Sequence, residues 1–140
     1  MNEENTIRVL YLEPEKEARV VEIADDLDAM QELVGGYIEE YMPFDDDVAL
    51  VCNEEGKMNG LPLNRAVTNE NGEIRDVICG SFFLCNALIG SESFLSLTEE
   101  QEKKYREKFR YPERFYRDGN GIRAVKFDPK KEHERSSEAR

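Results

Sequence analysis

The 140-residue sequence is long enough for one hydrophobic core and short for two, so we expect a single domain. Only 39% of the residues are hydrophobic, 36% are charged, and the formal net charge is −12. No apolar run approaches the roughly 20 residues that a membrane-spanning helix needs, and the first residues are acidic and polar where a signal peptide would be basic and then apolar. The composition therefore excludes a membrane-spanning protein and predicts a cytoplasmic one.

The charge is distributed unevenly along the chain. Residues 1–102 hold 24 acidic and 6 basic side chains, whereas residues 103–140 hold 13 basic and 7 acidic ones. An acidic surface repels free nucleic acid and anionic membranes and attracts basic molecules. We therefore expect a basic partner, and neither direct nucleic-acid binding nor membrane contact. The alternative is that the acidic side chains serve only solubility and charge matching within the chain.

Three cysteines, Cys52, Cys79 and Cys85, lie within apolar runs. An odd number of cysteines is not typical of a secreted disulfide framework. Their spacing contains no Cys-x-x-Cys pair, and the only histidine, His133, lies in the charged C-terminal segment. A zinc site would lack its ligands. We therefore expect buried, reduced thiols, and neither a metal nor a cofactor.

The first two predicted elements form a β-hairpin. Residues 6–13 and 18–23 are rich in β-branched and aromatic side chains, and Pro14 begins the turn between them. The segment that follows predicts one long amphipathic helix, which starts near Asp25 or Asp26 and ends before Pro43. We expect its apolar stripe to be buried in the core. The stripe consists of Leu27, Met30, Leu33, Val34, Tyr37, Ile38 and Tyr41.

Three segments follow this predicted helix. Residues 48–52 form a short apolar run, which predicts a buried and central strand. Residues 59–67 hold a glycine and a proline among apolar residues, and we interpret them as an ordered loop. Residues 74–87 predict a long strand, bent or bulged at Gly80, because an isolated glycine in such a run often marks a bulge.

The C-terminal third predicts a charged helix and a second hairpin. Thr98 and Gln101 have the spacing of a capping box, so we expect a helix from there to about residue 109. Residues 113–117 and 122–127 flank an Asp-Gly-Asn-Gly turn, and residues 129–140 are polar enough for a disordered tail.

Together these elements predict an α+β fold within residues 1–128. We expect a mixed or mostly antiparallel sheet with one long amphipathic helix packed on it. The second, charged helix and the C-terminal hairpin complete the predicted domain.

Two residue pairs are candidates for binding a small anion. Gly35 and Gly36 interrupt the predicted helix, where glycine costs roughly 1 kcal/mol relative to alanine, so a ligand or a closely packed strand must benefit from the missing side chains. Asn64 and Arg65 follow a stiff apolar turn, and a guanidinium suits carboxylate or phosphate. The alternative for the second pair is an internal acidic partner, which a chain with 31 Asp and Glu residues offers readily.

The sequence contains no recognisable set of catalytic residues. No histidine accompanies the serines within an apolar context, so acyl-transfer chemistry has no candidates, and we expect a protein that is not an enzyme. Residues 110–117 interleave arginines with aromatic side chains, which can track phosphates and stack on bases. Because most of the chain would repel nucleic acid, we favour docking of this segment on the acidic body of the protein.

A ridge of acidic side chains is the candidate surface for a basic partner. We expect it along the exposed side of the predicted long helix, at its start, and in the loop beyond its end. The ridge comprises Asp25, Asp26, Asp28, Glu32, Glu39, Glu40, Asp45, Asp46 and Asp47.

Four short motifs in succession resemble the domain of unknown function 3846 family. They are IRVLYLEP from residue 7, LVGGYIE from residue 33, CNEEGK from residue 52 and LPLNR from residue 61. The resemblance covers about residues 6–110 and leaves the C-terminal hairpin, about residues 113–127, outside. It implies a phage, plasmid or conjugative-element setting in Firmicutes and supplies no catalytic residues.

Small acidic proteins of such elements often antagonise host defence by imitating the charge of DNA, which is an argument by analogy. We therefore expect a non-catalytic interaction protein whose acidic face occupies a basic, nucleic-acid-binding surface. The alternative is a small anionic-ligand binder that uses Gly35, Gly36, Asn64 and Arg65.

Overall fold

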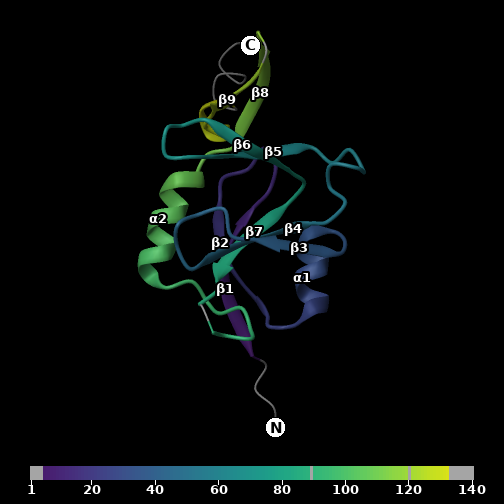
Figure 1. The fold of residues 1–140 in the computed structure, drawn as a ribbon, viewed down its shortest axis with the longest axis vertical. Helices are drawn as coiled ribbons and strands as arrows, with labels where there is room; N and C mark the ends of the chain where they lie inside the picture. Colours follow the sequence, from purple (N-terminus) through teal and green to yellow (C-terminus); the bar gives the residue numbers. More distant parts are fainter. Residues whose placement is uncertain (1–4, 89, 120, 133–140) are drawn as a thin grey trace.

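A five-stranded antiparallel sheet with the strand order β2-β1-β7-β4-β3 forms the centre of the protein (Figure 1). The computed structural model describes residues 5–88, 90–119 and 121–132. Two further antiparallel pairs, β5–β6 and β8–β9, lie beyond one end of this sheet (top in Figure 1). The strands are β1 (Thr6–Leu12), β2 (Arg19–Ala24), β3 (Ile38–Tyr41), β4 (Val48–Asn53), β5 (Leu63–Thr68), β6 (Ile74–Cys79), β7 (Phe82–Asn86), β8 (Glu113–Asp118) and β9 (Gly121–Lys126). The predicted α+β class is confirmed.

The two faces of the central sheet carry separate apolar clusters. In β4, Val48, Leu50 and Cys52 face one cluster, whereas Ala49 and Val51 face the other. Strand β7 alternates in the same way, and every residue of β4 is buried. Strands that are buried on both faces have continuous apolar sequences, which explains the uninterrupted run at residues 48–52. The strand is buried as predicted, but it lies between β7 and the edge strand β3, and β7 is the middle strand of the sheet.

Helix α1 (Leu27–Val34) covers one face of the sheet and is much shorter than predicted. The Asp26 side chain caps its N-terminus, and Gly35 ends it in the left-handed conformation at φ 80°. The chain after Gly36 continues into edge strand β3. Ile38 and Tyr41 therefore belong to this strand, and Tyr37 lies directly before it. The predicted stripe is therefore only partly core: Met30 and Val34 are buried, Leu33 is half-buried, and Tyr37 is 68% exposed.

The central segment contains three strands where the sequence predicted a loop and one long strand. Residues 63–68, predicted as part of an ordered loop, form β5 because they pair with β6. The predicted long strand 74–87 is two strands in different sheets, β6 and β7. The break occurs at Gly80, at φ 82°, where a Cβ would lie 2.7 Å from the Leu61 side chain. The glycine marks a change of sheet rather than a bulge.

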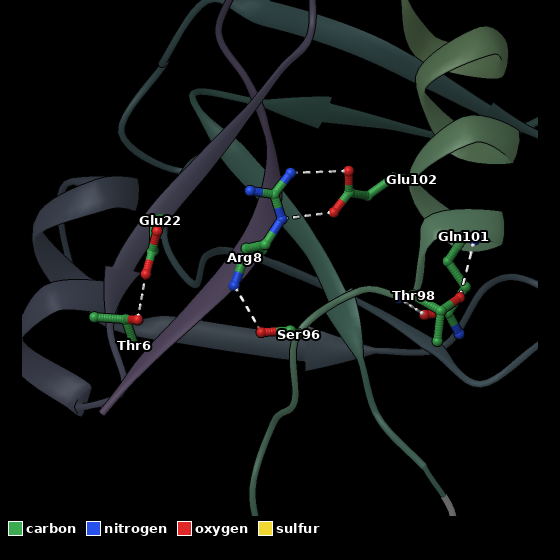
Figure 2. Close-up of polar contacts among 7 residues, drawn as sticks. All are labelled: Thr6, Arg8, Glu22, Ser96, Thr98, Gln101 and Glu102. Atoms are coloured by element: carbon green, nitrogen blue, oxygen red, sulfur yellow. Dashed lines mark hydrogen bonds and ion pairs between the residues drawn. The ribbon is translucent and has the colours of Figure 1, made fainter. Parts of the chain in front are cut away.

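Helix α2 (Glu99–Phe109) covers the opposite face of the central sheet. Its Tyr105 and Phe109 pack into the apolar cluster of that face, together with Val48 and Leu50. The predicted capping box between Thr98 and Gln101 is present. The Arg8 guanidinium on β1 bonds both carboxylate oxygens of Glu102, at 2.9 and 3.1 Å (Figure 2). This contact holds the first turn of α2 against the sheet, and it lowers the pKa of Glu102.

The predicted C-terminal hairpin is the β8–β9 pair, and it projects from the body (Figure 1). Only its first residue, Glu113, is deeply buried, and its carboxylate accepts a hydrogen bond from the Ala66 amide at 3.0 Å. Most of the side chains of both strands are exposed, so the predicted docking of this segment holds only at its base. Residues 129–132, predicted as part of a disordered tail, form a helical turn, and residues 133–140, with His133, lie outside the described residues.

Gly35 should be required for its backbone conformation alone. A Cβ there would meet nothing within 4 Å, yet a left-handed φ costs an L-residue about 1 kcal/mol or more. We expect Gly35→Ala to lower the free energy of unfolding in urea by about that amount, and Gly121→Ala, which has the same open space without positive φ, to change it by less than about 0.5 kcal/mol. Equal effects of the two substitutions would contradict this assignment.

Candidate functional site

Arg65, predicted as an anion ligand, is fully buried and binds main-chain carbonyls instead. Its Nε donates to Phe109 O at 3.2 Å, Nη1 to Glu13 O at 3.3 Å, and Nη2 to Lys16 O at 2.8 Å. These carbonyls belong to the C-terminus of α2 and to the turn between β1 and β2. The guanidinium therefore joins three segments that are distant in sequence.

Asn64 supports the same arrangement. Its Nδ2 donates to Leu12 O and Gly80 O at 2.9 and 2.8 Å, and its Oδ1 accepts from Arg65 Nη1 at 2.8 Å. Asn64 is also fully buried. The Asn64–Arg65 pair thus has no open face towards solvent. The LPLNR motif serves the fold, and we do not assign a ligand to it.

Burial disfavours both charged groups at this position. It lowers the pKa of Arg65 to about 10, an effect that nearby Glu113 partly offsets. Burial also raises the pKa of Glu113, against the hydrogen bond from Ala66 and the charge of Arg65. A buried guanidinium without such hydrogen bonds would cost several kcal/mol, so the carbonyls and Glu113 are a requirement of the fold.

The two glycines have neighbours different from those of the Asn64–Arg65 pair. Gly35 ends α1, and a Cβ on Gly36 would lie 2.9 Å from Asn53 Nδ2. Asn53 donates to Val34 O at 3.2 Å and so closes the end of α1 onto β4. Close packing of the helix against the sheet therefore explains Gly36, and the predicted four-residue anion site has no common set of contacts.

The predicted acidic ridge is divided among three surfaces. Asp25, Asp28 and Glu32 are exposed on and before α1. Glu39 and Glu40 are neighbours on β3, so their side chains leave opposite faces of the sheet. Asp45 is exposed and Asp47 half-buried in the loop before β4.

Asp46 is committed to a contact within the protein. Its carboxylate accepts from the Tyr105 hydroxyl at 2.9 Å and pairs with Lys104 at 3.2 Å. Burial acts in the opposite direction, but these contacts and the Asp47 amide lower its pKa. Asp46 therefore fastens the loop before β4 to α2.

A groove of about 540 Å³ lies between the start of α1, the open edge of β3 and the segment that follows β7. We call it the acidic groove. Its apolar lining includes Leu27, Met42 and Leu88, whose exposed fractions are 54%, 47% and 51%. Four carboxylates line it as well, and none of the described residues that line it is basic. They are Asp25, Asp26, Glu40 and Glu92.

The basic side chains of residues 103–132 form their ion pairs outside the acidic groove. Within the described residues, no ion pair involves any of the four carboxylates of the acidic groove. The pairs made by residues 103–132 go instead to the turn between β1 and β2, to the loop before β4 and to the C-terminal turn. They are Lys104–Asp46, Arg110–Glu17, Arg114–Glu15, Arg114–Glu132 and Lys130–Glu17.

A small polar crevice of about 90 Å³ lies where β3 and β4 meet β6. The Tyr41 hydroxyl donates to Asp76 Oδ2 at 3.2 Å, and Lys57 forms an ion pair with the same carboxylate. Burial and the Asp76 charge raise the pKa of Tyr41, and the hydrogen bond with Asp76 raises the pKa of Lys57. No local sequence pattern predicts this cluster, because its residues come from three separate segments. Its groups satisfy one another and join the two sheets.

Cys52 and Cys79 also line this crevice, and all three cysteines are free and buried, as expected. Burial raises the pKa of Cys52 to about 11 and that of Cys85 to about 12. Among the residues that the structure describes, no group of three or more His, Cys, Asp or Glu side chains is placed to hold a metal ion.

Comparison with known families gives a match to the model of a domain of unknown function, DUF3846, over residues 7–110. The chain belongs to the DUF3846 family. The match includes the Arg65 contacts, α1, the acidic groove and α2, and it ends before the β8–β9 hairpin. No curated protein and no solved structure matches this DUF3846 protein. No helix in its described part is long and apolar enough to cross a membrane.

Replacement of Arg65 tests its structural role in the DUF3846 domain. A lysine ammonium cannot bond the three carbonyls in the geometry of a guanidinium fork, so buried acceptors lose their donors. We expect Arg65→Lys to lower the free energy of unfolding by about 3 kcal/mol. The matched control is Arg75→Lys on the exposed side of β6, which should change it by less than about 0.5 kcal/mol. A stable Arg65→Lys protein would contradict the assignment.

The thiols should be unreactive in the folded protein. The raised pKa values of Cys52 and Cys85 leave little thiolate at mildly alkaline pH, and burial blocks access. We expect slow labelling by a disulfide reagent in native buffer and rapid labelling of three thiols in denaturant. A thiol that reacts within seconds in native buffer would refute this prediction.

Proposed function

We propose that this DUF3846 protein is a non-catalytic interaction protein that binds a basic protein partner through the acidic groove. The observation that carries the proposal is one groove with four carboxylates and three large apolar side chains that are about half exposed. Across residues 5–88, 90–119 and 121–132, none of these four carboxylates forms an ion pair. Charge alone would be consistent with solubility. Exposed apolar side chains beside the charge favour an interface.

The chemistry of the groove defines its occupant. Carboxylates at the rim suit lysine or arginine, and an apolar residue of the partner would pack on Leu27, Met42 and Leu88. Surface ion pairs contribute little affinity each, about 1 kcal/mol or less, but they raise the rate of association. We therefore assign affinity mainly to the apolar contacts and partner selection to the charges.

We further propose that the partner is a host nucleic-acid-binding or defence protein and that the setting is a phage or other mobile element. The overall charge of −12 supports this proposal, because such partners carry a basic surface that an acidic protein can occupy in place of DNA. An antagonist of this type should compete with DNA for the same surface.

Charge reversal in the groove provides the first test. The probe is a fluorescently labelled peptide that contains arginine and leucine residues, and the measurement is its anisotropy during titration with the protein. Glu40→Lys combined with Glu92→Lys should weaken binding about tenfold, since two exposed attractions become repulsions. Replacing the leucines of the peptide by serine should weaken binding to the wild-type protein as well.

The matched control is Glu70→Lys combined with Glu107→Lys, which changes the net charge equally but lies outside the groove. Equal weakening by both double variants would indicate a general charge effect and refute the groove as the binding site. A protein recovered from host lysate supports the proposal only if it is basic, is released by duplex DNA and is not retained by the groove variant.

A further inference from the structure

The edge of the five-stranded sheet at β3 is open. Among the strands that the structure describes, β3 has a single hydrogen-bonded neighbour, β4, and Glu39 and Glu40 on β3 are exposed. Tyr37 and Met42, directly before and after the strand, are 68% and 47% exposed. In Figure 1, β3 lies beside α1 at the border of the sheet. An open edge can accept a further strand.

The β3–β4 register determines which main-chain groups of β3 face this open edge. The Glu54 amide donates to Tyr37 O at 2.8 Å, so residues 37 and 54 form a hydrogen-bonded pair. Such pairs alternate with non-bonded ones along an antiparallel ladder, and the β3–β4 register is regular. The amides and carbonyls of Ile38 and Glu40 must therefore point away from β4. No described residue outside the ladder bonds them.

The same two residues contribute side chains to the acidic groove. Ile38, Glu40 and Met42 alternate along the chain and all line the groove, as the period of two in a strand requires. A strand added beside β3 would thus extend the sheet along the floor of the groove. Every second side chain of that strand would enter the groove.

The charges of β3 select the sequence of such a strand. Glu39 and Glu40 leave opposite faces, so two consecutive basic residues on an added strand would meet one carboxylate each. An apolar residue two positions from the one beside Glu40 would share its face and reach the apolar lining. The same carboxylates disfavour pairing of β3 with a second copy of itself, because like charges would lie opposite one another.

We propose that the basic partner binds by β-augmentation, as an extended segment with two consecutive basic residues that pairs with the outer edge of β3 at Ile38 and Glu40. This inference rests on the proposed function and adds its binding mode. The four residues of β3 span about 13 Å, enough to pair with about four residues of the partner. Main-chain hydrogen bonds supply affinity in this mode, and the alternating side chains supply specificity.

The test uses main-chain methylation of the peptide. The parent peptide carries Arg-Lys with a leucine two positions before the lysine, and single N-methyl variants are made along it. Methylation at alternate residues, whose N–H groups face β3, should weaken binding about tenfold, because a hydrogen bond is lost and the methyl group blocks strand approach. Methylation at the residues in between, whose N–H groups face solvent, is the matched control and should leave affinity unchanged.

Amide hydrogen exchange of the protein provides the second measurement. The parent peptide should slow exchange at Ile38 and Glu40 and have little effect at Glu39 and Tyr41, whose amides already face β4. If methylation has no alternating effect and Ile38 and Glu40 gain no protection, β-augmentation is refuted. In that case, weaker binding by the Glu40→Lys and Glu92→Lys variant would still support the acidic groove as a side-chain site. If the parent peptide and the arginine- and leucine-containing peptide both fail to bind the wild-type protein, the proposed function and this inference are both refuted.

Discussion

The buried guanidinium of Arg65 is the contact on which the arrangement of the domain depends. A guanidinium has five donors and no acceptor, so it can be buried only where several oxygens converge on it. Here three carbonyls from the β1–β2 turn and the end of α2 meet the side-chain oxygen of Asn64. None of the four acceptors is a charged carboxylate. The segments that provide them must therefore be in place together, which couples the folding of β5 to that of the sheet and of α2.

The two faces of the central sheet are covered unequally. The face of α2 is closed by an eleven-residue helix, by β5 and β6, and by the Asp46–Tyr105 contact. The other face has an eight-residue helix that ends at Gly35. Leu27, at the start of that helix, and Leu88, in the segment after β7, are half exposed in the acidic groove. The groove lies at the start of α1, and the end of α1 at Gly35 lets the residues that follow form the edge strand β3.

The ion pairs among the described residues all lie outside that groove. The basic residues of α2 and of the segment after it pair with Glu15, Glu17 and Asp46, close to where the chain packs on itself. Those pairs join the basic segment 103–140 to the acidic segment 1–102, as expected if the charges match within the chain. The acids beside α1 and on β3 are left without such partners among the described residues. Charge matching within the chain therefore explains one part of the acidic surface, but among the described residues it does not involve the carboxylates of the acidic groove.

The sequence by itself determined the local elements whose signals are contained within a few residues. The β1–β2 hairpin, the capping box at Thr98 and the buried strand at residues 48–52 depend on turn residues, on spacing, and on a continuous apolar run. These are properties of the chain that hold before it folds. The α+β class followed from their succession, and the family followed from the four motifs.

Only the tertiary structure decided where the chain changes element. Apolar residues at positions 37, 38 and 41 fit a helical period, but the left-handed Gly35 ends the helix. Pairing with β4 then makes Ile38–Tyr41 a strand. Residues 63–68 become β5 only because β6 is beside them.

The same holds for the candidate sites. Asn64 and Arg65 were predicted as part of an anion site, but their acceptors come from residues 12, 13, 16, 80 and 109, which no local pattern places beside them. The acidic groove likewise combines three segments that meet only in the folded chain. A side chain's type is written in the sequence, whereas its partners are set by which distant segments the core brings together.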